Sequence, residues 1–415
     1  MNDPFAMPPK KRFRRFTTLF MTAYMVSYLT RINFGAIIVE MVDSTGFSRS
    51  ELSIAITAAF FTYGAGQLLS GWIGDRIQPR TVVLIGLLVT SVINLVIPFC
   101  SGIALIVVLW GVNGLAQAFM WPPMVRLNSY LFDSDEYSRA SVRISWGSSG
   151  GTILLYLVSP LIITVLNWKF VFWIAGALGL IMSFVWLRLC CRIDPEREVK
   201  RAGSASSGSA EKTPLGFPFL LMLLMIMLAI ICQGVLRDGV ATWMPSFISE
   251  TYDLSNQISI LTGVLLPIFS IGCLQLSSLI NRRLVKNPIT LGGILFAVST
   301  LSALALYLFN GASPAVSVLF SALLNACAHG INLMLIVMTP PVFKKRGTVS
   351  LMSGVLNACT YIGASISTYG IAYISEKSGW GSTLLMWVLL AALGTALCLV
   401  SIRPWAKYSK KLMEE

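Results

Sequence analysis

The sequence predicts an all-α membrane protein that crosses the bilayer twelve times. Of its 415 residues, 55% are hydrophobic and only 12% are charged, and the mean hydropathy is +0.75. Soluble domains carry about 25% charged residues, and disordered chains combine low hydrophobicity with high charge, so both classes are excluded. The apolar residues fall in continuous runs of about 20, which is long enough for a membrane-spanning helix. A transmembrane β-barrel is excluded because its strands alternate and are only about 10 residues long.

Six apolar runs make up the first half of the chain. We expect membrane-spanning helices near residues 16–39, 52–74, 81–100, 103–125, 140–164 and 167–189. The first run follows a basic stretch, Lys10 to Arg15, and so imitates a signal peptide. Because Arg31 interrupts the run and no small-residue cleavage site follows, we interpret it as an uncleaved first helix.

Six more runs make up the second half. We expect helices near residues 217–248, 256–280, 288–310, 312–338, 347–375 and 380–402. The intervening stretch is charged and rich in Gly and Ser, which is typical of a flexible linker. The sequence therefore predicts an N-terminal six-helix bundle (1–189), a cytoplasmic linker (190–214) and a C-terminal six-helix bundle (215–415).

The basic residues predict the orientation in the membrane. Most of the 31 Lys and Arg residues fall on the side that holds both termini, whereas the opposite side has only Arg49, Lys169 and Lys377. Cationic loops mark the cytoplasmic face, so we expect both termini in the cytoplasm and the protein in the plasma (inner) membrane. The net charge of +13 is then a topology signal and does not indicate nucleic-acid binding. Basic blocks such as 344–346 are interpreted as anchors to anionic lipid.

The cysteines and the motif content do not indicate an enzyme. The eight Cys residues are scattered without a CxxC pair, so we expect neither a metal site nor a disulfide framework. The sequence also has no nucleophile–base set and no phosphate-cradling glycine loop. We expect no cofactor and no catalytic residues.

The two halves are related as a repeat. An offset of 206 residues maps Arg31 onto Arg237, Arg76 onto Arg282 and Gly86 onto Gly292. Parallel repeats of this kind describe the major facilitator architecture of two pseudo-symmetric six-helix bundles, with the substrate near the membrane midplane between them.

The loop after the second predicted helix reads GWIGDRIQPR and resembles the major facilitator loop signature. Small Gly71 permits close helix packing, and Asp75 can cap a helix start or pair with a basic residue, which would hold one conformation. We expect Gly71, Asp75, Arg76 and Arg80 to control conformational change. The alternative is a charged turn that only sets topology.

Arg31 and Arg237 lie inside predicted spans, one in each half. A guanidinium at that depth costs at least about 2.5–3.5 kcal/mol, so it faces a wet cavity or a partner. Two arginine forks suit a phosphate or carboxylate group. The alternative for Arg31 is a buried hydrogen bond to carbonyls or to a carboxylate of a neighbouring helix, and for Arg237 it is neutralisation by Asp238. Adjacent helical residues point about 100° apart, so we do not expect a face-to-face pair within one helix. Asp238 would then pair with another helix or carry a coupling proton.

Further polar and aromatic residues are candidates to line the cavity. Each has the alternative of an interhelical hydrogen bond or an interfacial anchor, and the sole histidine has the alternative of a buried structural group. The candidates are Tyr24, Tyr28, Tyr63, Gln67, Gln117, Trp121, Gln233, Asn325, His329 and Tyr361.

Four segments resemble one family, the organophosphate:phosphate antiporters, which include glycerol-3-phosphate and hexose-phosphate transporters. The segments are YLTRINF (28–34), NGLAQAFMWPP (113–123), GDRIQPR (74–80) and VLRDGVATWMPSF (235–247). The resemblance implies that Arg31 and Arg237 bind phosphate. The sequence departs from the family pattern at Ile32, Gln67 and Gly147, where the family carries Lys, Lys and His, so a smaller or singly charged anion stays open.

These observations predict a secondary transporter for a small organic anion. The favoured function is exchange of an organophosphate for inorganic phosphate by alternating access, carried out by a monomer in the lipid bilayer. One alternative is a proton- or cation-coupled carboxylate symporter, in which a proton takes the place of phosphate as the counter-substrate. Another is a sensor that binds hexose phosphate without transporting it.

Overall fold

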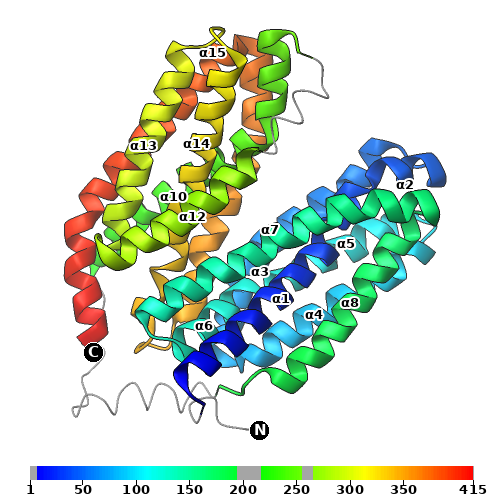
Figure 1. Ribbon diagram of the computed structural model, residues 1–415, viewed down its shortest axis with the longest axis horizontal. Coiled ribbons are helices and arrows are strands. Elements are labelled where there is room, and N and C mark those ends of the chain that lie inside the picture. The colour runs from blue at the N-terminus through cyan, green and yellow to red at the C-terminus, as the bar shows by residue number, and fades with distance from the viewer. Residues whose placement is uncertain (1–6, 194–215, 255–264, 415) are drawn as a thin grey trace. The chain divides into compact units, whose positions relative to one another are not determined.

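The computed structural model describes residues 7–193, 216–254 and 265–414, and nearly all of these are helical (Figure 1). Contacts divide the chain into two compact units. Unit 1 contains Met1–Ala205 together with Gly347–Val355, and unit 2 contains Ser206–Arg346 together with Leu356–Glu415. From position 194 onward the predicted linker lies outside the described residues.

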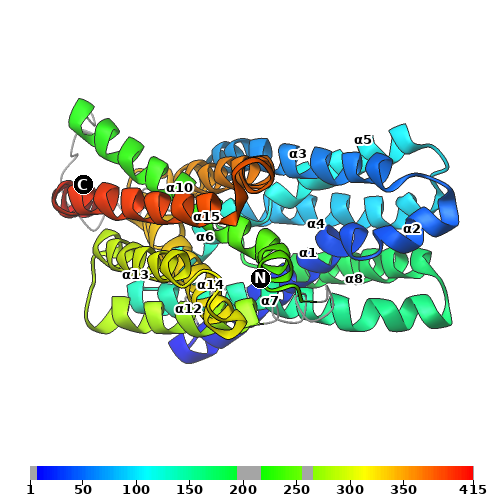
Figure 2. The same cartoon turned by 90° about the horizontal axis from the view of Figure 1, so that it is seen from above.

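The described part of unit 1 is a helical bundle. Its helices are α1 (Pro9–Ala36), α2 (Ile38–Thr45), α3 (Arg49–Arg76), α4 (Pro79–Val96), α5 (Ile103–Ala118), α6 (Trp121–Leu131), α7 (Ser134–Val165) and α8 (Trp168–Leu189). Helix α1 packs along α7, and α3 packs along α5, so helices distant in sequence lie side by side (Figure 2).

The ends of these helices follow from local stereochemistry. At the start of α3, Ser48 Oγ accepts the Glu51 N–H at 3.2 Å while Glu51 Oε2 accepts the Ser48 N–H at 2.8 Å, a reciprocal capping box. Asp133 caps α7 by accepting the Glu136 N–H at 2.8 Å. Gly46 ends α2 with φ of 75°, a left-handed conformation that glycine adopts readily.

The predicted span 103–125 is divided between α5 and α6. Pro122 and Pro123 follow Trp121 at the start of α6, and proline lacks the N–H that would continue the helical ladder of α5. The chain therefore breaks before Trp121. This break places Trp121 at the first turn of a new helix.

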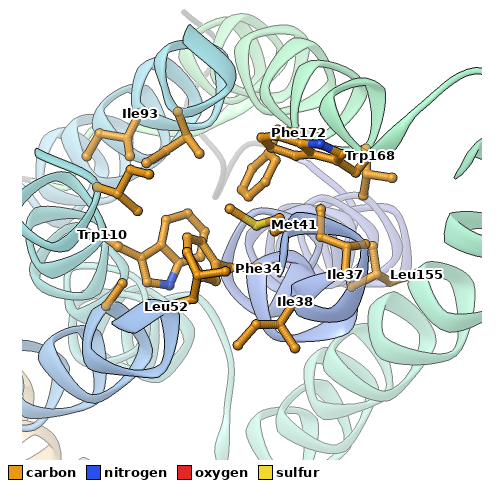
Figure 3. Packing of buried hydrophobic residues seen from close by; sticks show 14 of the residues in the cluster. Phe34, Ile37, Ile38, Met41, Leu52, Ile93, Trp110, Leu155, Trp168 and Phe172 are labelled. Carbon is orange, nitrogen blue, oxygen red and sulfur yellow. The ribbon is translucent and has the colours of Figure 1, made fainter. Parts of the chain in front are cut away.

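Aromatic rings form the core of unit 1 (Figure 3). The ring of Phe34 on α1 lies 4.9 Å from that of Trp110 on α5 and 5.9 Å from that of Phe172 on α8, centroid to centroid. Leu52 on α3 packs into the same cluster. Three helices, α3, α5 and α8, thus pack around α1 three residues after Arg31.

The described part of unit 2 is also helical. Its helices are α10 (Phe217–Tyr252), α12 (Leu265–Arg283), α13 (Pro288–Leu308), α14 (Pro314–Asn332) and α15 (Val349–Glu414), and a π turn (Leu333–Val337) continues α14. Helix α15 is 66 residues long and is kinked at Gly379, which has φ of 74°. The predicted spans 347–375 and 380–402 are the two arms of this helix. Its first residues, up to Val355, belong to unit 1.

Among the described residues, 11 helices are long and apolar enough to cross a membrane. Helix α1 is not one of them, although its 28 residues would span a bilayer, because Arg31 and Asn33 interrupt its apolar run. The predicted span 256–280 lies outside the described residues up to position 264. The all-α polytopic class is confirmed.

Candidate functional site in each unit

In unit 1, Arg31 lies over an aromatic platform. Its guanidinium carbon is 3.8 Å from the ring centroid of Tyr63 on α3 and 5.6 Å from that of Tyr28 on its own helix. A cation over a ring face is attracted by the ring quadrupole, and the attraction grows when water is excluded. Tyr63 is only 3% exposed, so this ring face is buried.

The aromatic surface continues away from Arg31. Tyr24 contacts Tyr28 and also Trp121 at the start of α6, each with ring centroids 5.2 Å apart. Five of the predicted site residues in unit 1 therefore lie together, on α1, α3 and α6. They present a cation with an aromatic, hydroxyl-bearing wall, which is suited to an anion that carries an organic group.

Behind Arg31, a buried polar network joins α1, α4 and α5. Gln117 donates from Nε2 to the hydroxyls of Thr30 and Thr90, at 2.9 and 2.8 Å. Asn94 donates to the carbonyls of Thr30 and Thr90, at 3.0 and 2.8 Å. Asn113 donates to the Thr30 carbonyl at 3.2 Å. The structure thus places Gln117 in interhelical packing, which was its alternative interpretation.

Asn33, Asn94 and Asn113 are part of this network and were not among the predicted residues. Asn33 donates to Asn94 Oδ1 at 2.7 Å, and all three side chains are buried. The signal that could have identified them is the cost of an amide in an apolar span, which requires a partner on another helix. Gln67, one turn after Tyr63 on α3, is likewise fully buried.

In unit 2, Arg237 and Asp238 form a two-pronged ion pair. Arg237 donates from Nε to Asp238 Oδ1 at 2.9 Å and from Nη2 to Oδ2 at 2.8 Å. The expectation that adjacent residues of α10 cannot meet was wrong. Cβ directions do differ by about 100°, but the long arginine side chain curls around the helix and reaches the carboxylate. The two side chains are 15% and 33% exposed, so the pair is only partly buried.

The other candidates of unit 2 differ in their burial and contacts. His329 on α14 is within electrostatic range of Arg237 and Asp238. Gln233 is fully buried and donates to the Ala328 carbonyl at 3.0 Å, which ties α10 to α14. Asn325 on α14 is also buried, whereas Tyr361 on α15 is partly exposed.

The loop signature lies against the start of α15, within unit 1. Asp75 accepts the backbone N–H groups of Ser350 at 2.8 Å and Leu351 at 2.7 Å, so it caps that helix. A Cβ on Gly71 would lie 2.8 Å from the Ser350 carbonyl oxygen, so only glycine permits this approach. The Asp75 carboxylate also lies 3.9 Å from Nε of Arg126 on α6.

Arg126 completes this cluster and was not among the predicted residues. It is fully buried and donates from Nη1 to the Gly74 carbonyl at 2.5 Å. Arg76 instead stacks on Trp72 of its own helix, 4.0 Å from the ring centroid. Arg80 donates to the Leu187 carbonyl and joins the start of α4 to the end of α8.

Most of the chain matches a known protein family. Residues 20–368 match the Major Facilitator Superfamily. The chain belongs to the Major Facilitator Superfamily. It is also similar to a solved superfamily member, the proton:xylose symporter XylE, with a TM-score of 0.73 and 12% identity over 94% of this chain and 95% of that one.

Three relatives of this superfamily protein cover nearly its full length. It is 26% identical to a glycerol-3-phosphate transporter of Bacillus subtilis (strain 168), over 90% of this chain and 88% of the relative. It is 23% identical to a probable hexose phosphate transport protein of Chlamydia pneumoniae, over 94% and 90%. It is 23% identical to the membrane sensor protein UhpC of Escherichia coli (strain K12), over 96% and 94%. These relatives are transporters and a sensor, not enzymes.

Proposed function

We propose that this protein transports a small organic anion, an organophosphate, in exchange for inorganic phosphate by alternating access. The observation that carries the proposal is one arginine at the same repeat position of each half, Arg31 and Arg237, inside a membrane-spanning bundle. Full-length relatives named for glycerol-3-phosphate and hexose phosphate support the same substrate class.

The chemistry of the two arginines differs in this proposal. Arg31 lies over Tyr63, 3.8 Å from the ring centroid, and its planar guanidinium group would bind an oxyanion with two N–H groups. Arg237 already holds a carboxylate with two N–H groups, the geometry that a phosphate would use. An incoming anion therefore has to displace Asp238, which makes binding at Arg237 an exchange of one anion for another.

The Asp75 cluster supports the conformational part of the proposal. The carboxylate holds two N–H groups at the start of α15 and faces buried Arg126. Movement of α15 away from α3 would break both N–H contacts and leave Asp75 facing Arg126 alone. We propose that Gly71, Asp75 and Arg126 form a latch that stabilises one conformation, whereas Arg76 and Arg80 contribute to the fold around it.

The test is exchange of labelled phosphate into proteoliposomes loaded with phosphate. Glycerol-3-phosphate and hexose phosphates are the competitors, and a proton uncoupler is the control for coupling. We expect saturable exchange that an organophosphate inhibits and that the uncoupler leaves unchanged. No exchange by folded protein would contradict the proposal.

A second candidate is a proton-coupled symporter of a carboxylate, favoured by the Arg237–Asp238 pair beside His329. Protonation of Asp238 would release Arg237 for a singly charged substrate. Uptake would then depend on a pH gradient. A third candidate, a sensor, is favoured only by the likeness to UhpC, and it would bind a hexose phosphate without transporting it.

We further propose that the protein acts as a monomer in the plasma (inner) membrane with both termini in the cytoplasm. The support is the concentration of Lys and Arg on the side of the termini.

A further inference from the structure

A groove of unit 1 combines a cationic mouth with apolar walls. It lies between the first turns of α1 and the last turns of α8 and has a volume of about 690 Å³. Lys10, Lys11, Arg14 and Arg15 line the mouth. This volume is in the range of small-molecule sites, which are about 300–1,000 Å³.

The lining changes from charged to apolar along α1. Residues 10, 11, 14, 15, 18, 19 and 22 line the groove, a spacing that places them on one helical face. The four cations come first, and Thr18, Leu19 and Thr22 follow toward the membrane interior. Met182, Val185 and Leu189 of α8 form the facing wall. This order, charge and then apolar surface, is the order of groups in a phospholipid.

In the described part of unit 1, the cations of the mouth differ from the neighbouring Arg12 in their ion pairing. Arg12, on the opposite face of α1, lies 3.7 Å from Glu136 of α7. Arg15 donates to the Leu189 carbonyl at 3.5 Å and to Met7 Sδ at 3.9 Å, and its guanidinium carbon lies 5.8 Å from the ring centroid of Phe16. Among the described residues, no acidic side chain pairs with Lys10, Lys11 or Arg14.

A second groove occurs at the equivalent place of unit 2, between α10 and the end of α15, with a volume of about 450 Å³. The offset that relates Arg31 to Arg237 also maps Arg15 and Leu19 of the first groove onto Leu221 and Met225 of the second. Arg403 and Lys407 supply the cations there. The same amphipathic groove in both repeats indicates a property of the fold and not an accident of side-chain placement.

We propose that the α1–α8 groove binds an acidic diacyl phospholipid. The phosphate lies among Lys10, Lys11 and Arg14 at the membrane surface, and an acyl chain lies along Leu19, Met182 and Val185. Basic pockets between helix ends at the membrane surface bind acidic headgroups, with about 1 kcal/mol for each Lys or Arg. A free phosphate compound would leave the apolar wall unused, so the lipid is the ligand that fits the whole groove. The α10–α15 groove, with fewer cations, binds the same lipid more weakly.

The test is native mass spectrometry of the purified full chain with dioleoylphosphatidylglycerol or dioleoylphosphatidylcholine. We expect the acidic lipid to bind about tenfold more tightly, and the triple variant K10Q/K11Q/R14Q to lose about tenfold or more of that affinity. The matched control R282Q/R283Q/K286Q removes the same charge at the end of α12 and just after it, where these residues line neither groove, and should stay within about twofold.

Two further arms separate the alternatives. Val185→Trp fills the apolar part of the groove and leaves every cation in place. It should therefore weaken binding of the acidic lipid while the charged mouth keeps its structure. Soluble glycerophosphoglycerol, which has the headgroup but no chains, should not displace the lipid. Equal binding of both lipids, equal loss in the two triple variants, no effect of Val185→Trp, or displacement by the soluble headgroup would each overturn the proposal.

Discussion

Arg31 and Tyr63 form a cation–ring contact that we expect to orient the anion-binding fork. Arg31→Lys keeps the charge but removes the planar two-pronged donor, so the KM for substrate exchange should rise about tenfold or more. Tyr63→Phe keeps the ring face and should stay within about threefold, whereas Tyr63→Leu removes it and should weaken binding by about threefold to thirtyfold. Exchange rates measured against substrate concentration check this series. A wild-type KM for Arg31→Lys would contradict binding of the anion by two N–H groups of Arg31.

Asp238 occupies the donors of Arg237 that a substrate would need. Asp238→Asn removes the competing charge while keeping the shape, so a doubly charged phosphomonoester should gain affinity relative to a singly charged carboxylate, by about fivefold. The two inhibition constants against phosphate exchange give the ratio. Asp253→Asn, at the end of α10, makes the same charge change away from Arg237 and should leave the ratio unchanged. An unchanged ratio in Asp238→Asn would show that substrate does not displace this carboxylate.

At this scale the sequence predicted the grouping of several candidates better than it predicted their individual contacts. Arg31, Tyr28 and Tyr63 were candidates because a charged residue inside a span and its polar neighbours leave a pattern, and the structure brings the three together. Their role in binding stays a prediction. The Arg237–Asp238 pair was excluded because spacing describes Cβ directions and not the path of a long side chain. Gln117 was assigned to the cavity because its partners, on α1 and α4, are distant in sequence.

Close packing of α7 against α1 sets the position of Tyr28. A Cβ on Gly151 would lie 2.6 Å from the Met25 carbonyl oxygen and 3.1 Å from Tyr28 Cβ, whereas a Cβ on Gly150 would lie 4.0 Å from its nearest neighbour, Met25 Sδ. Gly151→Ala should therefore destabilise the bundle by about 1–3 kcal/mol and lower substrate affinity, while Gly150→Ala should be nearly neutral. Thermal unfolding in detergent compares the two variants, and equal melting temperatures would contradict this packing.

The capping of α15 by Asp75 makes a second prediction about elements. Asp75→Ala leaves buried Arg126 without its carboxylate and two N–H groups without their acceptor, which should cost about 3 kcal/mol or more. Hydrogen exchange of the Ser350 and Leu351 amides should accelerate in this variant. Arg76→Gln, on an exposed side chain of the same loop, should leave both amides protected, and acceleration there too would mean that the loop acts as a whole.

The apolar runs predicted where the helices lie better than where each helix begins and ends. The apolar runs located the helices, but Pro122 and Pro123 divide a predicted span, and Gly379 joins two predicted spans into one kinked helix. Arg126 illustrates a further limit. It follows an apolar run as a topology residue would, and only the fold shows that α6 brings it beneath Asp75.

For the whole molecule, composition predicts the structural class but not how the chain is divided between the two units. Hydropathy and run length were sufficient for the all-α membrane class, and the repeat predicted two related units. The grouping of Gly347–Val355 with unit 1 was not predictable, because it depends on the contact of α15 with Asp75 and not on chain order.

Orientation in the membrane can be tested through a native thiol. Cys100 lies in the loop between α4 and α5 and is partly exposed, and the proposed topology places it outside the cell. A membrane-impermeant maleimide should label it in right-side-out vesicles, and Cys100→Ser should abolish that labelling. Met413→Cys, at an exposed position near the C-terminus, should react only after the membrane is permeabilised.

The pH dependence of this labelling distinguishes Cys100 from a fully solvated thiol. Burial raises the pKa of the Cys100 thiol, and the thiolate is the reactive form. The fraction of thiolate at neutral pH is therefore small, and the labelling rate should rise about tenfold per pH unit until the pH approaches the raised pKa. Cys190, fully buried at the end of α8 with its pKa also raised by burial, should stay unlabelled throughout. Labelling of Met413→Cys without permeabilisation would reverse the proposed orientation, because an even number of spans keeps both termini on one side.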